Sequence, residues 1–131
     1  SFKGYEFDED LVNLEDALII NKILLDKKRY GVIDTCNYYY RQRSIRGSTV
    51  DKVKAKKGYF TDRLTDFYEN IIDHSISLDG KIPDFIQYLM AYDLQWLLKV
   101  PNLKVFDTKE EIQEFWEHLY FVIHHIVYFS A

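Results

Sequence analysis

Apolar residues recur at helical spacing in four stretches of this chain. The first stretch covers residues 14–25 and ends in the basic residues 27–29, which suit a helix C-terminus. Asn13 can cap its start, and Glu15 and Asp16 place negative charge in the first turn, where the free N–H groups favour it. The pattern predicts a helix that begins after Asn13 and ends near residue 27.

Three further helices follow the same reasoning. The second is expected to start near residues 48–51 and to close at Gly80, a natural left-handed cap. The third has Pro83 in its first turn, where a missing N–H is harmless, and the fourth opens on a Thr108–Glu111 capping box. The residues expected on the buried faces are Phe60, Leu64, Phe67, Tyr68, Ile71, Ile72 and Ile76 in the second helix; Ile82, Phe85, Ile86, Leu89, Met90, Leu97 and Val100 in the third; and Ile112, Phe115, Trp116, Leu119, Ile123 and Ile126 in the fourth.

Between the first two helices lie two β-rich runs, 30–34 and 38–43, which predict a short strand pair. The expected fold class is therefore mainly α: four amphipathic helices with a short β element near residues 30–43. A length of 131 residues suits one compact unit with a single core.

Composition narrows the class of protein. Apolar residues make up 47% and charged residues 29%, which is typical of a globular chain, and the net charge of −4 argues against general nucleic-acid binding. The single Cys36 excludes an internal disulfide and fits a reducing compartment. Because no histidine is placed beside it, we expect Cys36 to be packed or half-buried rather than catalytic.

Two stretches carry candidate chemistry. Glu15 and Asp16 sit where a carboxylate stays ionised, as a general base requires, although acidic residues in a first turn commonly only cap the helix. The run 41–57 holds seven basic residues and one acid. Its Arg41 and Arg43 can receive a phosphate through charge-assisted hydrogen bonds, and the alternative is a solvated loop.

Two further sets of residues are of types that can form a site. Asp93 falls on the buried side of the third helix and therefore needs a partner such as an arginine or a tyrosine hydroxyl. We expect that contact to be structural. His118 and His125 share a face of the last helix, but spacing provides no third ligand, so no metal site is predicted.

The order of these segments resembles a known family. FDEDLVNLEDALIINKILLDKKRYGVIDTCNYYYRQRSIRGSTV is similar to the C-terminal part of the catalytic domain in bacterial family-2 glycosyltransferases, which have a GT-A type fold. KIPDFIQYLMAYDLQW is similar to the helical extension of capsular-polysaccharide and teichoic-acid-type members. The resemblance implies a remnant of the catalytic domain over residues 1–50 and the helical extension over 51–131.

The resemblance also implies roles for residues. Asp16, with Glu15 beside it, matches the base that deprotonates the acceptor hydroxyl in an inverting transfer from a nucleotide sugar. The segment near the donor diphosphate or the acceptor is matched by four residues, taken as substrate-binding: Tyr40, Arg41, Arg43 and Ser48. The half that binds the nucleotide and a divalent metal, Mg or Mn, is not in this chain. We therefore expect a fragment that is inactive alone.

In the parent enzyme the expected partners are a nucleotide sugar and a glycan acceptor, with no nucleic acid. The expected location is the cytoplasm, at the inner face of the membrane. A fragment separated from its sheet is expected to expose an apolar patch or to cover it by forming a homodimer. Two alternatives stay open: a non-catalytic helical module that docks a partner through its aromatic face, and a phosphate binder that uses the basic loop.

Overall fold

A computed structural model describes residues 4–7, 11, 14–37, 39, 56–99 and 103–126 of the chain. Its helices are α1 (Glu15–Lys27), α3 (Asn70–Asp79), α4 (Asp84–Leu98) and α5 (Lys109–His124). A π-helix, η2 (Arg63–Glu69), runs directly into α3, and the short 3-10 turns η1 (Lys57–Tyr59) and η3 (Leu103–Val105) complete the set. The prediction of a mainly α fold with four helices is confirmed for these residues.

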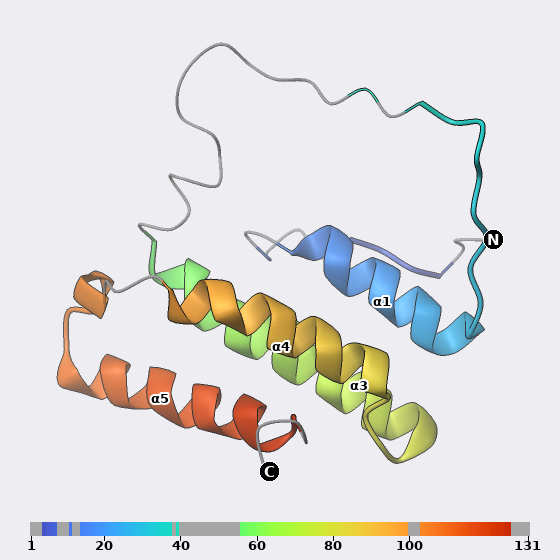
Figure 1. The fold of residues 1–131 in the computed structure, drawn as a ribbon. Helices are drawn as coiled ribbons and strands as arrows, with labels where there is room; N and C mark the ends of the chain where they lie inside the picture. The colour runs from blue at the N-terminus through green and yellow to red at the C-terminus, as the bar shows by residue number, and fades with distance from the viewer. Residues whose placement is uncertain are drawn as a thin grey trace.

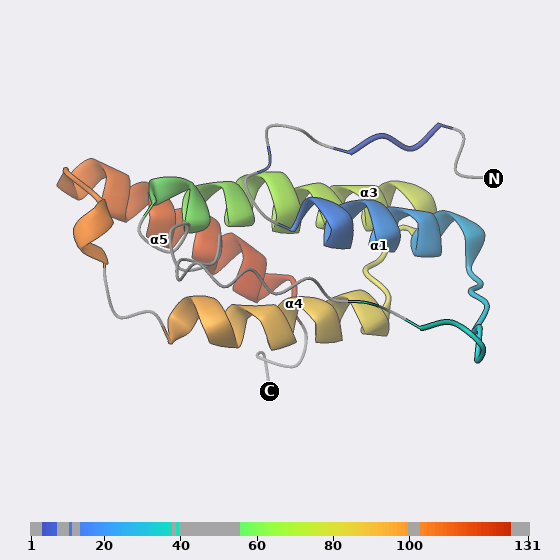
Figure 2. The same ribbon diagram turned by 90° about the horizontal axis from the view of Figure 1, so that it is seen from above.

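The helices pack around the rod formed by η2 and α3. Figures 1 and 2 show α1 beside the α3 part of this rod and α5 beside its η2 part, while α4 returns along it after the turn at Gly80. This arrangement encloses one core whose members come from all of these helices. The buried apolar side chains of the core include Leu18, Leu25, Phe60, Leu64, Phe67, Tyr68, Ile71, Ile72, Ile86, Met90, Leu94, Leu97, Phe115, Leu119 and Val122.

The second helix does not start where the sequence pattern predicts. Lys56 has extended backbone angles, so no helix runs continuously from residues 48–51 into the described part. Residues 48–55 lie outside the described residues. Gly80 closes the helix as predicted: it has a φ of 67° and donates its N–H to the carbonyl of Ile76 at 2.8 Å. Ile76 is 41% exposed, so its predicted burial is wrong.

α4 buries most of the predicted face, with Ile86, Met90 and Leu97 in the core. The prediction is wrong for Phe85, which is 44% exposed, and it left out Leu94, which is buried. The helix is apolar nearly all round, so spacing alone does not set the limits of its buried face. Pro83 directly precedes α4, and its carbonyl accepts the N–H of Ile86. Val100 lies outside the described residues.

α5 begins as predicted. The Thr108 hydroxyl accepts the N–H of Glu111, and the Glu111 carboxylate accepts the N–H of Thr108 in return. The prediction that Trp116 is buried is wrong, since it is 49% exposed, and Val122 takes a place in the core. The buried stripe on α5 is therefore narrower than the run of apolar residues.

The predicted strand pair is absent from the part of residues 30–43 that the structure describes, namely 30–37 and 39. Tyr30, Val32 and Ile33 are 82%, 84% and 71% exposed. Figure 1 shows this segment leaving the helices after α1. High β-propensity reflects a fit to a neighbouring strand, and nothing described pairs with this segment. The expected exposed apolar patch is present here.

Two further observations concern exposure. Cys36 is exposed, so the expectation of a packed or half-buried thiol is wrong: the segment that carries it does not fold onto the core.

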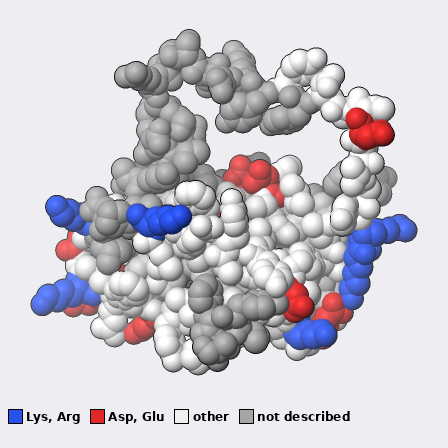
Figure 3. Space-filling view, viewed as in Figure 1, with Lys and Arg blue, Asp and Glu red and all other residues white. Residues whose placement is uncertain are grey.

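Within the described ranges, no helix combines the length and apolar character needed to cross a bilayer. In Figure 3 the middle of one face of the molecule is mostly uncharged, and Lys and Arg side chains gather toward its two ends.

Candidate functional site

Glu15 and Asp16 open α1, as their position in the sequence predicts. Asp16 is exposed, and its Oδ1 accepts the N–H of Ala17 at 2.7 Å. The carboxylate therefore lies at the N-terminal turn, where the free N–H groups stabilise negative charge. An exposed, ionised carboxylate in this place can accept a proton from an incoming hydroxyl.

The backbone before this pair is unusual. Leu14 is the N-cap residue, and among the described residues no side-chain cap hydrogen bond is present at this helix start. Leu14 has a φ of 71° and a ψ of 11°, a left-handed conformation that costs a non-glycine residue on the order of 1 kcal/mol or more. Such strain is often found where the chain must present functional groups in a set direction. Asn13, the predicted cap, lies outside the described residues.

The N-terminal segment is held against α1 beside Glu15. The Tyr5 hydroxyl donates to Asp26 Oδ2 at 2.5 Å, and His74 Nε2 lies 2.9 Å from Asp26 Oδ1. The hydrogen bond from Tyr5 lowers the pKa of Asp26, assisted by His74. These contacts hold Tyr5 at the C-terminal end of α1, and Glu6 and Phe7 follow it in sequence. Together with Glu15, Leu18, Ile19 and Lys22 they line a small cleft of about 250 Å³.

The other predicted substrate-binding residues are not placed relative to Asp16. Tyr40, Arg41, Arg43 and Ser48 all lie outside the described residues. Their grouping with Glu15 and Asp16 stays a prediction. Of the predicted site residues, the structure describes only Glu15 and Asp16. The small cleft beside Glu15 is an additional feature that the structure shows.

Asp93 has the partners that its buried position requires. The Tyr68 hydroxyl donates a hydrogen bond to Asp93 Oδ2, and Arg63 Nε lies 3.5 Å from the same oxygen. Arg63 Nη1 donates to the Tyr59 hydroxyl at 3.1 Å, and the guanidinium stacks on the Tyr59 ring at 4.4 Å. Burial, followed by the charge of Asp93 and its hydrogen bond, raises the pKa of Tyr68, which keeps the phenol protonated as a donor. The cluster ties η2 to α4 and is structural, as predicted.

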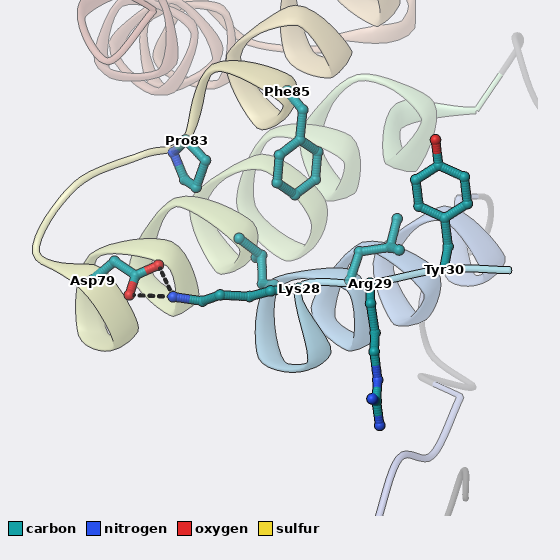
Figure 4. Close-up of a pocket in the computed structure, with 8 residues that line it drawn as sticks. Lys28, Arg29, Tyr30, Asp79, Pro83 and Phe85 are labelled. Carbon is teal, nitrogen blue, oxygen red and sulfur yellow. Dashed lines mark hydrogen bonds and ion pairs between the residues drawn. The ribbon is translucent and has the colours of Figure 1, made fainter.

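A larger cleft lies where the end of α1 meets the turn between α3 and α4. It has a volume of about 680 Å³. Figure 4 shows Phe85 and Pro83 across from α1, the Tyr30 ring on the same side as Phe85, and Arg29 pointing away from both. Lys28 Nζ spans the gap to Asp79, 2.7 Å from its Oδ1. The lining consists of Leu24, Leu25, Lys28, Arg29, Tyr30, Asp79, Pro83 and Phe85.

Sequence reasoning missed this cleft because it treated Phe85 as core and Tyr30 as part of a strand. The chain turns away from α1 at Lys28, which has a φ of 53° and donates its N–H to Leu24. That turn leaves Tyr30 beside the start of α4 instead of in a sheet. The sequence feature that could have indicated the cleft is Tyr30, an aromatic residue that directly follows the basic residues at the end of α1.

The two histidines considered as metal ligands point to different partners. His118 Nδ1 lies 2.5 Å from Glu69 Oε1, while His125 Nδ1 contacts the carbonyl oxygen of Phe121 at 2.8 Å. No group of three or more His, Cys, Asp or Glu side chains able to hold a metal occurs among the residues described.

Two known proteins, both named for teichoic acid biosynthesis, are similar to this chain. Over 119 residues, 91% of the chain, it is 34% identical to the minor teichoic acid biosynthesis protein GgaB of Bacillus subtilis (strain 168). Over 110 residues, 80% of the chain, it is 31% identical to the minor teichoic acid biosynthesis protein GgaA of the same organism. No family model and no solved structure matches.

The matches cover only part of each relative. The chain spans 13% of the length of GgaB and 24% of the length of GgaA. Both matches extend over most of the chain. The chain is thus similar, over most of its length, to a segment of two proteins of teichoic acid biosynthesis.

Proposed function

We propose that this chain is a segment of an inverting, family-2 glycosyltransferase of GT-A type that adds sugar to a cell-surface glycopolymer of the teichoic-acid class. The observation that supports the proposal is the similarity of 91% of the chain to a segment of the minor teichoic acid biosynthesis protein GgaB. The exposed carboxylate of Asp16 at the start of α1 supplies a group suited to the chemistry.

In this proposal Asp16 is the general base. It removes the proton of the acceptor hydroxyl while that oxygen attacks the anomeric carbon of the sugar, and the nucleoside diphosphate leaves from the opposite face. Asp16 is exposed in the first turn of α1, where an acceptor hydroxyl can approach it. Glu15, on the edge of the small cleft with Lys22, helps to position the acceptor.

The remaining groups of the reaction are assigned to other parts of the polypeptide. Tyr40, Arg41, Arg43 and Ser48 contact the donor diphosphate or the acceptor. A part of the protein outside this chain binds the nucleotide and a divalent metal, Mg or Mn, which offsets the charge of the leaving diphosphate. The protein acts in the cytoplasm at the inner face of the membrane, where nucleotide sugars are made.

The test uses the full-length natural protein with a nucleotide sugar and a teichoic-acid acceptor. Asp16→Asn is expected to lower kcat on the order of 1,000-fold, because loss of a general base costs about 10²–10⁴ in rate. Affinity for the nucleotide sugar should not change. The matched control is Asp73→Asn, which alters an exposed helix carboxylate far from α1's start. Full activity of Asp16→Asn, or an equal loss of kcat in Asp73→Asn, would refute the assignment of Asp16 as the general base.

A second function is supported by a separate observation. Aromatic side chains on α4 are exposed, including Tyr92 at 64% and Trp96 at 48%, as in a non-catalytic module that docks a partner through this face. An inactive full-length protein that nevertheless co-purifies with another polypeptide, and loses it on Tyr92→Ala, would favour this function.

A further inference from the structure

The outer face of α4 carries a row of aromatic side chains, here called the aromatic stripe: Phe85, Tyr88, Tyr92 and Trp96. Steps of three, four and four residues keep the four rings on one side of the helix. They are 44%, 59%, 64% and 48% exposed. The core residues of α4, such as Met90 and Leu94, lie on the other side.

The stripe is long and uncharged. Trp96 lies eleven positions after Phe85 on the α-helix, a span of about 16 Å. The rings of Tyr92 and Trp96 meet edge to face with centroids 6.5 Å apart. Asp93, the one acid between Phe85 and Trp96, is bound to Tyr68 and Arg63 on the inner side. The surface therefore offers apolar ring faces with polar tips, and no charge.

A cation lies at each end of the stripe. At the C-terminal end, Lys99 Nζ sits 4.7 Å from the centroid of the Trp96 ring. At the N-terminal end, Phe85 lines the 680 Å³ cleft whose wall contains Lys28. Lys28 is already paired with Asp79, but its side chain is 63% exposed and can shift to an incoming anion.

We propose that the aromatic stripe and its cleft bind a glycan chain that carries phosphodiesters. The apolar faces of sugar rings stack on the aromatic rings, while the tyrosine hydroxyls and the indole N–H bond to sugar hydroxyls. Lys99 and Lys28 receive the phosphates. The inference rests on the proposed function and deepens it: the stripe holds the growing acceptor polymer while its end reacts elsewhere.

The experiment measures binding directly and needs no donor or transfer step, so it succeeds or fails independently of the proposed enzymatic activity. The chain is made with Trp116→Phe, which leaves Trp96 as the sole indole. A phosphomannan oligosaccharide is titrated at low salt and Trp96 fluorescence is followed. Poly(glycerol phosphate), which has phosphates but no sugar rings, is the second probe. Far-ultraviolet circular dichroism confirms that each variant is folded.

Phosphomannan is expected to change Trp96 fluorescence saturably. Tyr92→Ala should weaken binding about tenfold, since one stacked ring contributes on the order of a tenfold change in affinity. Tyr120→Ala is the matched control: Tyr120 is 65% exposed on α5, against 64% for Tyr92, and lies outside the stripe. Its affinity should not change. Lys99→Gln should weaken binding and reduce the dependence on salt.

Three results would overturn the inference. One is the absence of saturable binding of phosphomannan. Another is an equal loss of affinity for phosphomannan in Tyr92→Ala and Tyr120→Ala. Equally tight binding of poly(glycerol phosphate) that Tyr92→Ala does not change counts with this second result, because such binding would reflect only ionic attraction. The third is a homodimer that Tyr92→Ala dissociates and phosphomannan does not, because a second copy of the chain would then be the occupant of the stripe.

Discussion

Tyr68 on η2 donates a hydrogen bond to Asp93 on α4, and this contact joins the two elements that no short loop connects. Arg63 lies on the other side of the same carboxylate oxygen, with its Nε at 3.5 Å. Arg63 and Asp93 side chains are 7% and 16% exposed, so both charges are largely removed from water. Removing one partner of such an ion pair strongly destabilises the fold, because the other charge is left buried without a partner.

Asp93→Ala is expected to destabilise the fold by about 3–5 kcal/mol, because it leaves the Arg63 charge buried without its carboxylate. Tyr68→Phe should cost only about 1–2 kcal/mol, since the ion pair survives. Urea unfolding followed by circular dichroism provides both values. Asp73→Ala, at an exposed position on α3, serves as the control. A loss for Asp93→Ala no larger than that of the control would show that the cluster does not hold η2 to α4.

Acid should weaken the contact between η1 and α5. The hydrogen bond from Lys57, 2.9 Å from Glu111 Oε1, lowers the pKa of Glu111, and the N–H of Asp107 adds to the effect. A carboxyl group with a lowered folded-state pKa contributes stability above its unfolded value of about 4.3, and loses it as pH falls through the folded-state pKa.

Thermal unfolding midpoints measured from neutral pH down to about pH 3 check this expectation. In Lys57→Gln the thermal unfolding midpoint should fall less than in the wild type as the pH is lowered. Lys81→Gln, which removes an exposed lysine at the α3–α4 turn, should leave the fall unchanged. If Lys57→Gln keeps the wild-type pH profile, the ion pair does not couple pH to folding.

Gly80→Ala should destabilise the fold by about 1 kcal/mol. Gly80 has a φ of 67°, a conformation that an L side chain adopts only with strain, and open space surrounds the added Cβ. The cost is therefore one of backbone conformation alone. Gly31→Ala is the matched control, since its Cβ also meets nothing and its φ is not in the left-handed region. Equal midpoints in urea for the two variants would contradict the left-handed cap.

Cys36 should react with a thiol reagent in the native state nearly as fast as in urea. The side chain is exposed on the segment that follows α1. A coloured disulfide exchange reagent provides the rate in both conditions. Strong protection of the native thiol would mean that this segment packs onto another surface.

Local chemistry was sufficient wherever neighbours in sequence form the contact. Thr108 and Glu111 predicted the start of α5, Gly80 predicted the end of α3, and the basic residues after Leu25 predicted the end of α1, because each signal acts within one helical turn. The need of Asp93 for an arginine or tyrosine partner also followed from its place among apolar residues. The identity of that partner did not.

The tertiary structure alone decided which apolar residues are buried. α4 is apolar on both sides, so only its packing against η2 and α3 determined that Leu94 enters the core and that Phe85 and Trp96 do not. The same is true of the segment after α1: Val32 and Ile33 have the propensity for a strand, but a strand requires a neighbour to accept its hydrogen bonds. Burial and pairing depend on residues distant in sequence, whereas helix ends depend on residues three or four positions away.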